Sequence, residues 1–167
     1  MKNKFIILLL TMISFNCFSQ TKESGSRYFK ASFNNITIDI PDGFEAVPNQ
    51  NGFLHKGSAS TLMINEISNS PYSFTVSHFK PENLEKDGAK VTEMQEIKTA
   101  AGQDALLYTL TLTLPGKDNT TKVDFERMVL LTGNNNTTFC VVASYPLIIR
   151  DLILEPLKTS MLSVIIN

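Results

Sequence analysis

The chain has 167 residues, of which 43% are hydrophobic and 19% are charged. This length indicates one domain with a short extension, and the apolar content excludes global disorder. With 15 basic and 16 acidic residues, the formal net charge is −1, which excludes a nucleic-acid-binding protein that depends on a basic stripe.

Residues 1–19 have the pattern of a secretory signal peptide. Lys2 and Lys4 form a short positive region, and an apolar run over residues 5–13 follows. This run is shorter than the ~20 apolar residues that span a bilayer. We therefore expect export, to the periplasm or the medium, and no transmembrane segment in the mature chain. A buried N-terminal helix or strand is the alternative.

The end of this segment allows two kinds of processing. Small residues at Cys17 and Ser19 favour cleavage before Gln20, whereas lipidation of Cys17 would leave a lipid anchor. Cleavage before Gln20 leaves Cys140 as the last cysteine, which excludes an intramolecular disulfide. The fold must then be held by its core, and a chain of ~150 residues can bury enough surface for this.

The first part of the mature chain combines a polar segment with short strands. Residues 20–32 are polar and predict a flexible lead-in, so we place a single α+β domain at 33–167. Residues 36–40 alternate apolar and polar side chains, as a half-buried strand does, and Pro-Asp-Gly at 41–43 forms a turn. Further short strands, which complete a small antiparallel meander, are predicted over residues 44–47, 52–56 and 61–67.

A helical layer is predicted next. The sequence Asn-Ser-Pro at 69–71 is a helix start signal, and Gly88 ends the pattern. We expect a broken helical layer over residues 71–87. A strand over residues 72–79 is the alternative, because β-branched residues occur there.

Long strands are predicted in the second half of the chain, after a shorter one at 91–98. Over residues 105–114 large apolar residues alternate with mainly threonine, which predicts a long strand. Residues 122–132 return as its hairpin partner after a turn at 115–119. Residues 137–145 are small or apolar on both faces, which predicts a central strand covered on both sides.

The chain ends in a predicted amphipathic helix that opens at Pro146. Its apolar positions recur at spacings of three and four residues and are Ile149, Leu152, Ile153, Leu157, Met161 and Val164. Pro156 lies inside the pattern and predicts a kink or a restart. We expect the apolar face to pack on a face of the long strands that includes either Leu110 and Leu112 or Val141.

The order of these elements predicts the fold class. Strands, a helical layer, two long hairpins and a final helix are typical of an α+β protein. We therefore expect an antiparallel sheet of about six or seven strands, with helical layers packed on it and a C-terminal helix.

No catalytic motif occurs in the sequence, which favours a non-enzymatic protein without a bound cofactor. Two histidines are present, His55 near a turn and His78 beside Phe79, and a zinc site would need further convergent ligands. We expect both imidazoles to be exposed or half-buried. A Ser-His-Asp triad that uses either histidine stays open, because triads assemble in space rather than in sequence.

Two groups of carboxylates lie at turns. Asp39, Asp42 and Glu45 surround a proline turn, and Asp118 and Asp124 flank the loop of the long hairpin. Neither group has the spacing of a calcium-binding loop. We therefore expect solvated carboxylates and no metal site.

Two residues of the long strands need separate interpretation. Cys140 lies in a strand that is apolar on both faces, which predicts an inert core thiol; a reactive thiol or an intermolecular disulfide is the alternative. Arg127 shares a predicted face with Phe125, Val129 and Leu131. Either Arg127 points to the core side and needs a partner, or a strand bulge turns it outward.

Several steps along the chain resemble one family. The chain is similar to the PsbP-like superfold in five features. These are Ile-Thr-Ile-Asp-Ile-Pro-Asp-Gly-Phe at 36–44, Leu-Met-Ile at 62–64, the helical layer, the long hairpins and the Tyr-Pro step at 145–146. The extrinsic subunit of photosystem II, the Ran guanine-nucleotide release factor and small exported bacterial proteins of unknown role share this fold. The resemblance covers residues 33–166 and implies an antiparallel sheet between helical layers, without catalytic residues. The Phe-Ser-Gln at 18–20 also resembles the signals of exported Bacteroidetes proteins.

Three functions follow as hypotheses. The first is a non-enzymatic, exported binding or assembly module of the cell envelope, whose partner is an envelope protein or a small ligand. The second is a carrier of a small apolar ligand held between sheet and helix, which needs an internal cavity of ~300 Å³ or more. The third is a hydrolase whose site is assembled in space.

Overall fold

The computed structural model describes residues 19–21, 27–85, 88–116 and 120–167. The predictions for residues 1–18, including lipidation of Cys17, lie outside the described residues, and so does Asp118.

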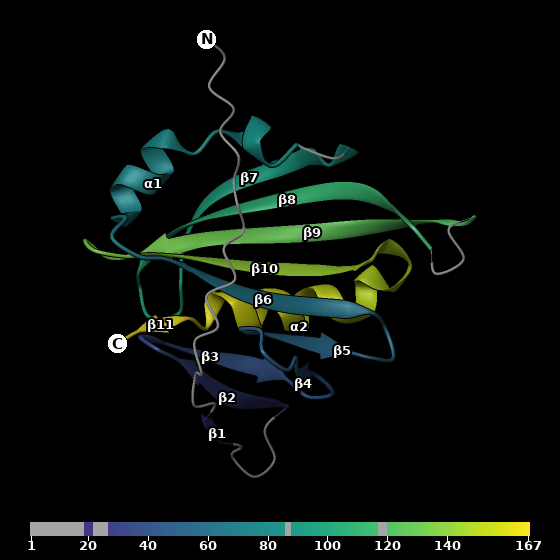
Figure 1. Cartoon of the computed structure of the whole chain (residues 1–167), viewed down its shortest axis with the longest axis horizontal. Helices are drawn as coiled ribbons and strands as arrows, with labels where there is room; N and C mark the ends of the chain where they lie inside the picture. Colours follow the sequence, from purple (N-terminus) through teal and green to yellow (C-terminus); the bar gives the residue numbers. More distant parts are fainter. Residues whose placement is uncertain (1–18, 22–26, 86–87, 117–119) are drawn as a thin grey trace.

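Two antiparallel sheets form the framework (Figure 1). The large sheet has the strand order β4-β5-β6-β10-β9-β8-β7, and the small sheet has the order β1-β2-β3-β11. The large sheet comprises β4 (Glu45–Ala46), β5 (Gly52–His55), β6 (Ser60–Ile67), β7 (Lys90–Lys98), β8 (Asp104–Pro115), β9 (Lys122–Gly133) and β10 (Thr138–Pro146). The small sheet comprises β1 (Ser19–Thr21), β2 (Tyr28–Phe33), β3 (Ile36–Pro41) and β11 (Ile165–Ile166).

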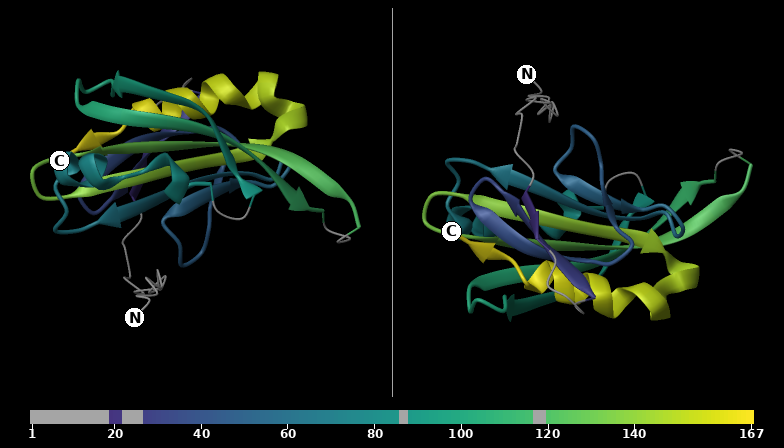
Figure 2. Two further views of the ribbon diagram at one scale, coloured as in Figure 1. Left: turned by 90° about the horizontal axis from the view of Figure 1, so that it is seen from above. Right: turned by 90° about the horizontal axis from the view of Figure 1, so that it is seen from below.

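Helices cover the two faces of the large sheet. One face carries α1 (Tyr72–His78) and the 3-10 turn η1 (Pro81–Asn83), and the other carries η3 (Leu147–Ile149), α2 (Arg150–Leu162) and the small sheet. Figure 2 shows α1 and α2 on opposite sides of the strands. The predicted α+β class, with a helical layer in the middle of the chain and a C-terminal helix on the sheet, is confirmed. No helix among the described residues is both long and apolar enough to cross a membrane.

The alternation in β8 explains why this sheet has two cores. Leu106, Tyr108 and Leu110 are buried in the cluster beneath α1, while Ala105 and Leu107 are buried in the cluster beneath α2. Strand neighbours point to opposite faces, and here both faces are apolar.

Strand β10 is central, as predicted, because it pairs with β6 on one side and β9 on the other. Its two faces are covered unequally. Phe139, Val141 and Tyr145 are buried under α2 and the small sheet, whereas Cys140 and Val142 are half-buried on the α1 side. The short helix α1 covers less of the sheet than α2 and the small sheet together.

Two predictions for the first part of the chain are wrong. Residues 28–32 of the predicted lead-in belong to strand β2, in which Ala31 and Phe33 are buried. Apolar side chains alternate with Lys30 and Ser32 there, and this period of two is the strand signal that the polar composition of residues 20–32 obscured. The segment 36–40 is a strand, but it pairs with β2 and β11 instead of joining the meander β4-β5-β6.

The predicted apolar face of the last helix is also partly wrong. Leu157 and Met161 are buried, but Leu152 is 79% exposed. Each residue turns about 100° around a helix, so Leu152 lies beside the stripe that Ile153 and Leu157 define. The helix runs without interruption through Pro156. Of the two surfaces expected beneath it, the one with Val141 is correct, since Leu110 lies in the cluster on the α1 side.

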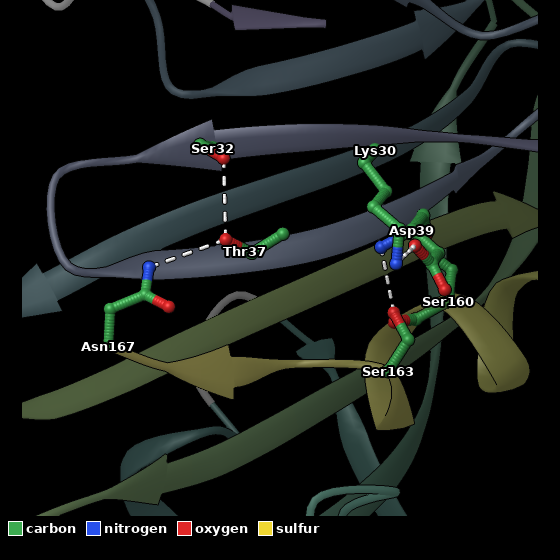
Figure 3. Close-up of polar contacts among 7 residues, drawn as sticks. All are labelled: Lys30, Ser32, Thr37, Asp39, Ser160, Ser163 and Asn167. Carbon is green, nitrogen blue, oxygen red and sulfur yellow. Dashed lines mark hydrogen bonds and ion pairs between the residues drawn. The ribbon is translucent and has the colours of Figure 1, made fainter. Parts of the chain in front are cut away.

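The end of α2 and strand β11 together hold the outer edge of β3 (Figure 3). The Asp39 backbone N–H donates to Ser163 Oγ at 2.8 Å, and Ser160 Oγ donates to the Asp39 carbonyl. At Thr37, two residues before Asp39 in β3, Asn167 Nδ2 donates to the Thr37 Oγ1 at 3.3 Å. Since β11 is only two residues long, serine side chains take over the strand pairing where it ends.

Candidate functional site

A buried carboxylate lies where α2 meets the large sheet, and the sequence analysis did not single it out. Glu126 of β9 is 6% exposed and stands opposite Tyr145 of β10. The Tyr145 hydroxyl donates to Glu126 Oε1, and Arg150 Nε lies 3.3 and 3.2 Å from the two carboxylate oxygens. The three side chains therefore fasten the first turn of α2 to β9 and β10.

The electrostatics of this cluster follow from burial and from the charge of Glu126. Burial raises the pKa of Tyr145 first, and the hydrogen bond and charge of Glu126 raise it further. The same carboxylate raises the pKa of Arg150. Tyr145 therefore stays a neutral donor, and the cluster has the character of a structural clamp. The sequence could have indicated this cluster through Glu126, because it is an acidic residue on the otherwise apolar strand face that carries Met128 and Leu130.

Arg127 lies on the opposite face of the same strand. The pairing of β9 with β8 and with β10 is continuous at Arg127, so no bulge turns it outward. The predicted sharing of a face with Val129 and Leu131 is correct. Its partner is the Ser144 hydroxyl, which lies 2.9 Å from Nε.

His55 makes a histidine–serine contact of the kind that a hydrolase would need. Its Nδ1 lies 2.8 Å from Ser58 Oγ, and Ser58 Oγ lies 2.9 Å from Ser60 Oγ. The tautomer of the His55 ring decides which atom of the His55–Ser58 pair donates. The His55 ring also packs against Phe44, with 5.4 Å between ring centroids. This arrangement stabilises a turn.

The second histidine lies at the end of α1. His78 Nδ1 lies 2.9 Å from the Phe74 carbonyl oxygen and 3.0 Å from Ser77 Oγ. Its ring stacks on Phe74 with 4.2 Å between centroids. His78 is exposed, and its contacts close the last turn of its own helix.

The remaining candidates take part in local contacts. Burial raises the pKa of Cys140 to about 11, so the thiol is protonated near neutral pH and is a poor nucleophile. Glu45 forms an ion pair with Lys56, and Asp39 pairs with Lys30 at 3.7 Å. The Thr113 hydroxyl donates to Asp124 at 2.7 Å. In the part of the chain that the structure describes, no three metal-ligating side chains converge.

Two half-open hollows lie on the surface of the large sheet. The first, of about 300 Å³, is lined by Gly88, Lys90, Thr111, Leu112, Thr113, Asp124, Phe125 and Leu147. The second, of about 350 Å³, lies between α1 and the strands β7 and β8, and we call it the α1 groove. Its lining residues are Tyr72, Val76, Glu96, Ile97, Asp104, Ala105 and Leu106. His55, His78 and Cys140 do not line these two hollows.

Exposed aliphatic side chains gather where α2 begins. Leu147, Ile148 and Leu152 are 39%, 92% and 79% exposed, and we call these three residues the helix-start patch. Ile148 lies in the 3-10 turn η3, and Leu152 lies in the first turn of α2 that follows it. Leu147 also lines the first hollow, so the patch continues into a partly apolar depression with Leu112 and Phe125.

No family model and no curated protein sequence matches the chain. Among solved structures, it is similar to PA94, a protein of unknown function from Pseudomonas aeruginosa, with a TM-score of 0.54 and 14% sequence identity. The match covers 90% of this chain and 97% of PA94. A Bacteroides thetaiotaomicron protein matches with a TM-score of 0.49 and 11% identity, over 79% of this chain and 45% of its own.

The PsbP protein CyanoP of Synechocystis sp. PCC 6803 matches with a TM-score of 0.46 and 12% identity, over 93% of this chain and 96% of its own. The matches to PA94 and to CyanoP both extend over most of the chain. Identities this low show a fold and carry no activity. The chain is thus an α+β protein that shares its fold with PA94, a bacterial protein of unknown function.

Proposed function

We propose that this protein is an exported, non-enzymatic binding or assembly module of the cell envelope. The observation that supports binding most strongly is the helix-start patch. Ile148 and Leu152 are almost fully exposed although both are large aliphatic residues. Exposed apolar side chains that cluster, rather than occur singly, are typical of interaction sites.

The size of the patch suits a contact point within a wider interface. Burying one leucine or isoleucine side chain contributes ~1.5–3 kcal/mol, so Ile148 and Leu152 together would contribute about 3–6 kcal/mol. Association itself costs ~4–15 kcal/mol. The partner must therefore also contact the adjoining hollow, where Leu112 and Phe125 offer further apolar surface.

Affinity capture from envelope extracts tests this function with matched variants. Ile148→Ser combined with Leu152→Ser removes the two most exposed side chains of the patch. Phe74→Ser combined with Met94→Ser is the control, because Phe74 and Met94 are 57% and 56% exposed elsewhere on the surface. The wild type and the second pair should capture the same partner, and the first pair should lose it. Capture that all three proteins retain, or that none achieves, contradicts a role for the patch.

Export is supported by the lysines, the short apolar run and the small residues in residues 1–19. Intact-mass measurement of the protein from periplasm and medium tests it. A mature chain that starts at Gln20 is expected. Retention of Met1 contradicts export with cleavage, and a lipid-modified Cys17 would instead establish membrane anchoring.

A carrier of a small ligand is the second candidate function, and the α1 groove is the observation that favours it. The groove lies between a helix and the sheet, as a carrier requires, and its ~350 Å³ falls at the lower end of small-molecule sites, ~300–1,000 Å³. It is half-open rather than internal, so a ligand would keep one side in water.

A further inference from the structure

The α1 groove combines an apolar floor with acidic edges. In the pairing of β7 with β8, Glu96 stands opposite Leu106, and the next pairs are Ile97 with Ala105 and Lys98 with Asp104. Residues directly opposite in a sheet share a face. The Glu96 carboxylate therefore projects on the α1 side, next to the buried Leu106 side chain.

Helix α1 supplies the opposite wall of the groove. Tyr72 and Val76 are four positions apart, so they lie on one side of the helix. Both pack against the cluster that contains Leu106. Backbone contact fixes the start of this helix, since Tyr72 N–H donates to the Asn134 carbonyl at 2.9 Å. The position of this wall therefore does not depend on a bound ligand.

The charge in the groove is negative. Asp104 is partly neutralised by Lys98, whose Nζ lies 2.6 Å from its carboxylate. Among the residues that the structure describes, the Glu96 carboxylate has neither a hydrogen bond nor an ion pair. Burial raises the pKa of Tyr72, and the charges of Asp104 and Glu96 raise it further. Both carboxylates therefore act on the Tyr72 hydroxyl.

We propose that the α1 groove binds a small organic cation with an apolar body, such as an aromatic or aliphatic amine. This inference rests on the carrier function proposed above and names its ligand class. The apolar body would lie against Val76 and Leu106, the ammonium group would pair with Glu96, and the face of Tyr72 would add cation–π attraction. An anion would be repelled from the same position.

Titration by amide NMR tests the proposal with a matched pair of probes, 2-phenylethylamine and its neutral isostere 2-phenylethanol. The purified protein is compared with Glu96→Gln, and with Glu93→Gln as the control. Glu93 is exposed on the same strand but does not line the groove. Substitution of either exposed carboxylate leaves the core intact, so both variants should fold.

The amine should shift the signals of Val76, Ile97 and Ala105 and bind more tightly than the alcohol. Glu96→Gln should weaken amine binding roughly fivefold, which is the effect of an exposed ion pair, and leave alcohol binding unchanged; Glu93→Gln should change neither. Equal affinities for both probes, unaffected by Glu96→Gln, overturn the cationic preference but keep the carrier function. No shift at these signals with either probe refutes the carrier function as well.

Discussion

Replacing Glu126 and Tyr145, singly and together, measures how strongly the buried cluster stabilises the fold. Glu126→Leu leaves the Tyr145 hydroxyl without its acceptor, and Tyr145 is fully buried. An unsatisfied buried donor costs ~1–3 kcal/mol. The ion pair with Arg150, whose side chain is 44% exposed, adds at most ~1 kcal/mol because solvent screens it. We expect the free energy of unfolding to fall by about 1–4 kcal/mol.

Tyr145→Phe and the double variant complete the test. Tyr145→Phe removes a hydrogen bond to a charged group and should cost ~1.5–3 kcal/mol. In the double variant Glu126→Leu with Tyr145→Phe, no buried donor remains unsatisfied, so its cost should be well below the sum of the two single costs. Urea unfolding followed by circular dichroism measures all four proteins. Strict additivity, or a Glu126→Leu protein as stable as the wild type, would refute the clamp.

Three further predictions concern stability and use the same unfolding assay. Leu157→Ser should destabilise the protein by about 2–5 kcal/mol, as removal of a buried leucine does, whereas Leu152→Ser should stay within ~0.5 kcal/mol of the wild type; the reverse order would show that α2 presents its other side to the sheet. Burial raises the pKa of Cys140 to about 11 in the folded protein. As pH rises through ~9, the thiol therefore ionises first in the unfolded chain. The free energy of unfolding should then fall by up to about 3 kcal/mol by pH ~11. The difference in stability between wild type and Cys140→Ala should shrink over that range, and a difference independent of pH contradicts a raised pKa of the thiol. Gly43→Ala should cost ~1–3 kcal/mol, because Gly43 has a φ of +86° and a Cβ there would lie 2.9 Å from the His55 ring; a neutral effect would mean that the turn can rearrange.

The long strands were the most predictable part of the fold. In β8 the alternation of leucine with threonine extends over enough residues to exclude a helix, and in β10 two apolar faces can only belong to a central strand. The helix α2 was predicted in its extent but not in its orientation. Residues 149–164 contain more apolar positions than one stripe needs, so spacing alone allows a face with Leu152 and a face without it. Contact with β3 selects the second, because Ser160 and Ser163 must reach Asp39.

The buried cluster of Glu126, Tyr145 and Arg150 could not be predicted from the sequence, for a different reason. Glu126 and Arg150 are 24 positions apart, and they meet only because the end of β10 lies beside the start of β9, where Tyr145 pairs with Glu126. Arg127 needs a partner on its face of β9, and a hydroxyl suffices at its half-buried position. The acidic residue beside it has the larger energetic demand, since its burial is almost complete.

The fastening of β3 by the end of α2 determines the order in which the chain can fold. The contacts of Asp39 with Ser160 and Ser163 span 121 and 124 positions, so they join residues from opposite ends of the domain. Long separations slow folding, because the entropy of closing the loop is lost before the contact forms. The hairpin of β2 and β3 emerges early in synthesis with an unpaired edge, and that edge stays open until residues 160–166 are available. The small sheet can therefore be completed only with the C-terminal residues, and loss of a few of them would expose a strand edge that other chains can pair with.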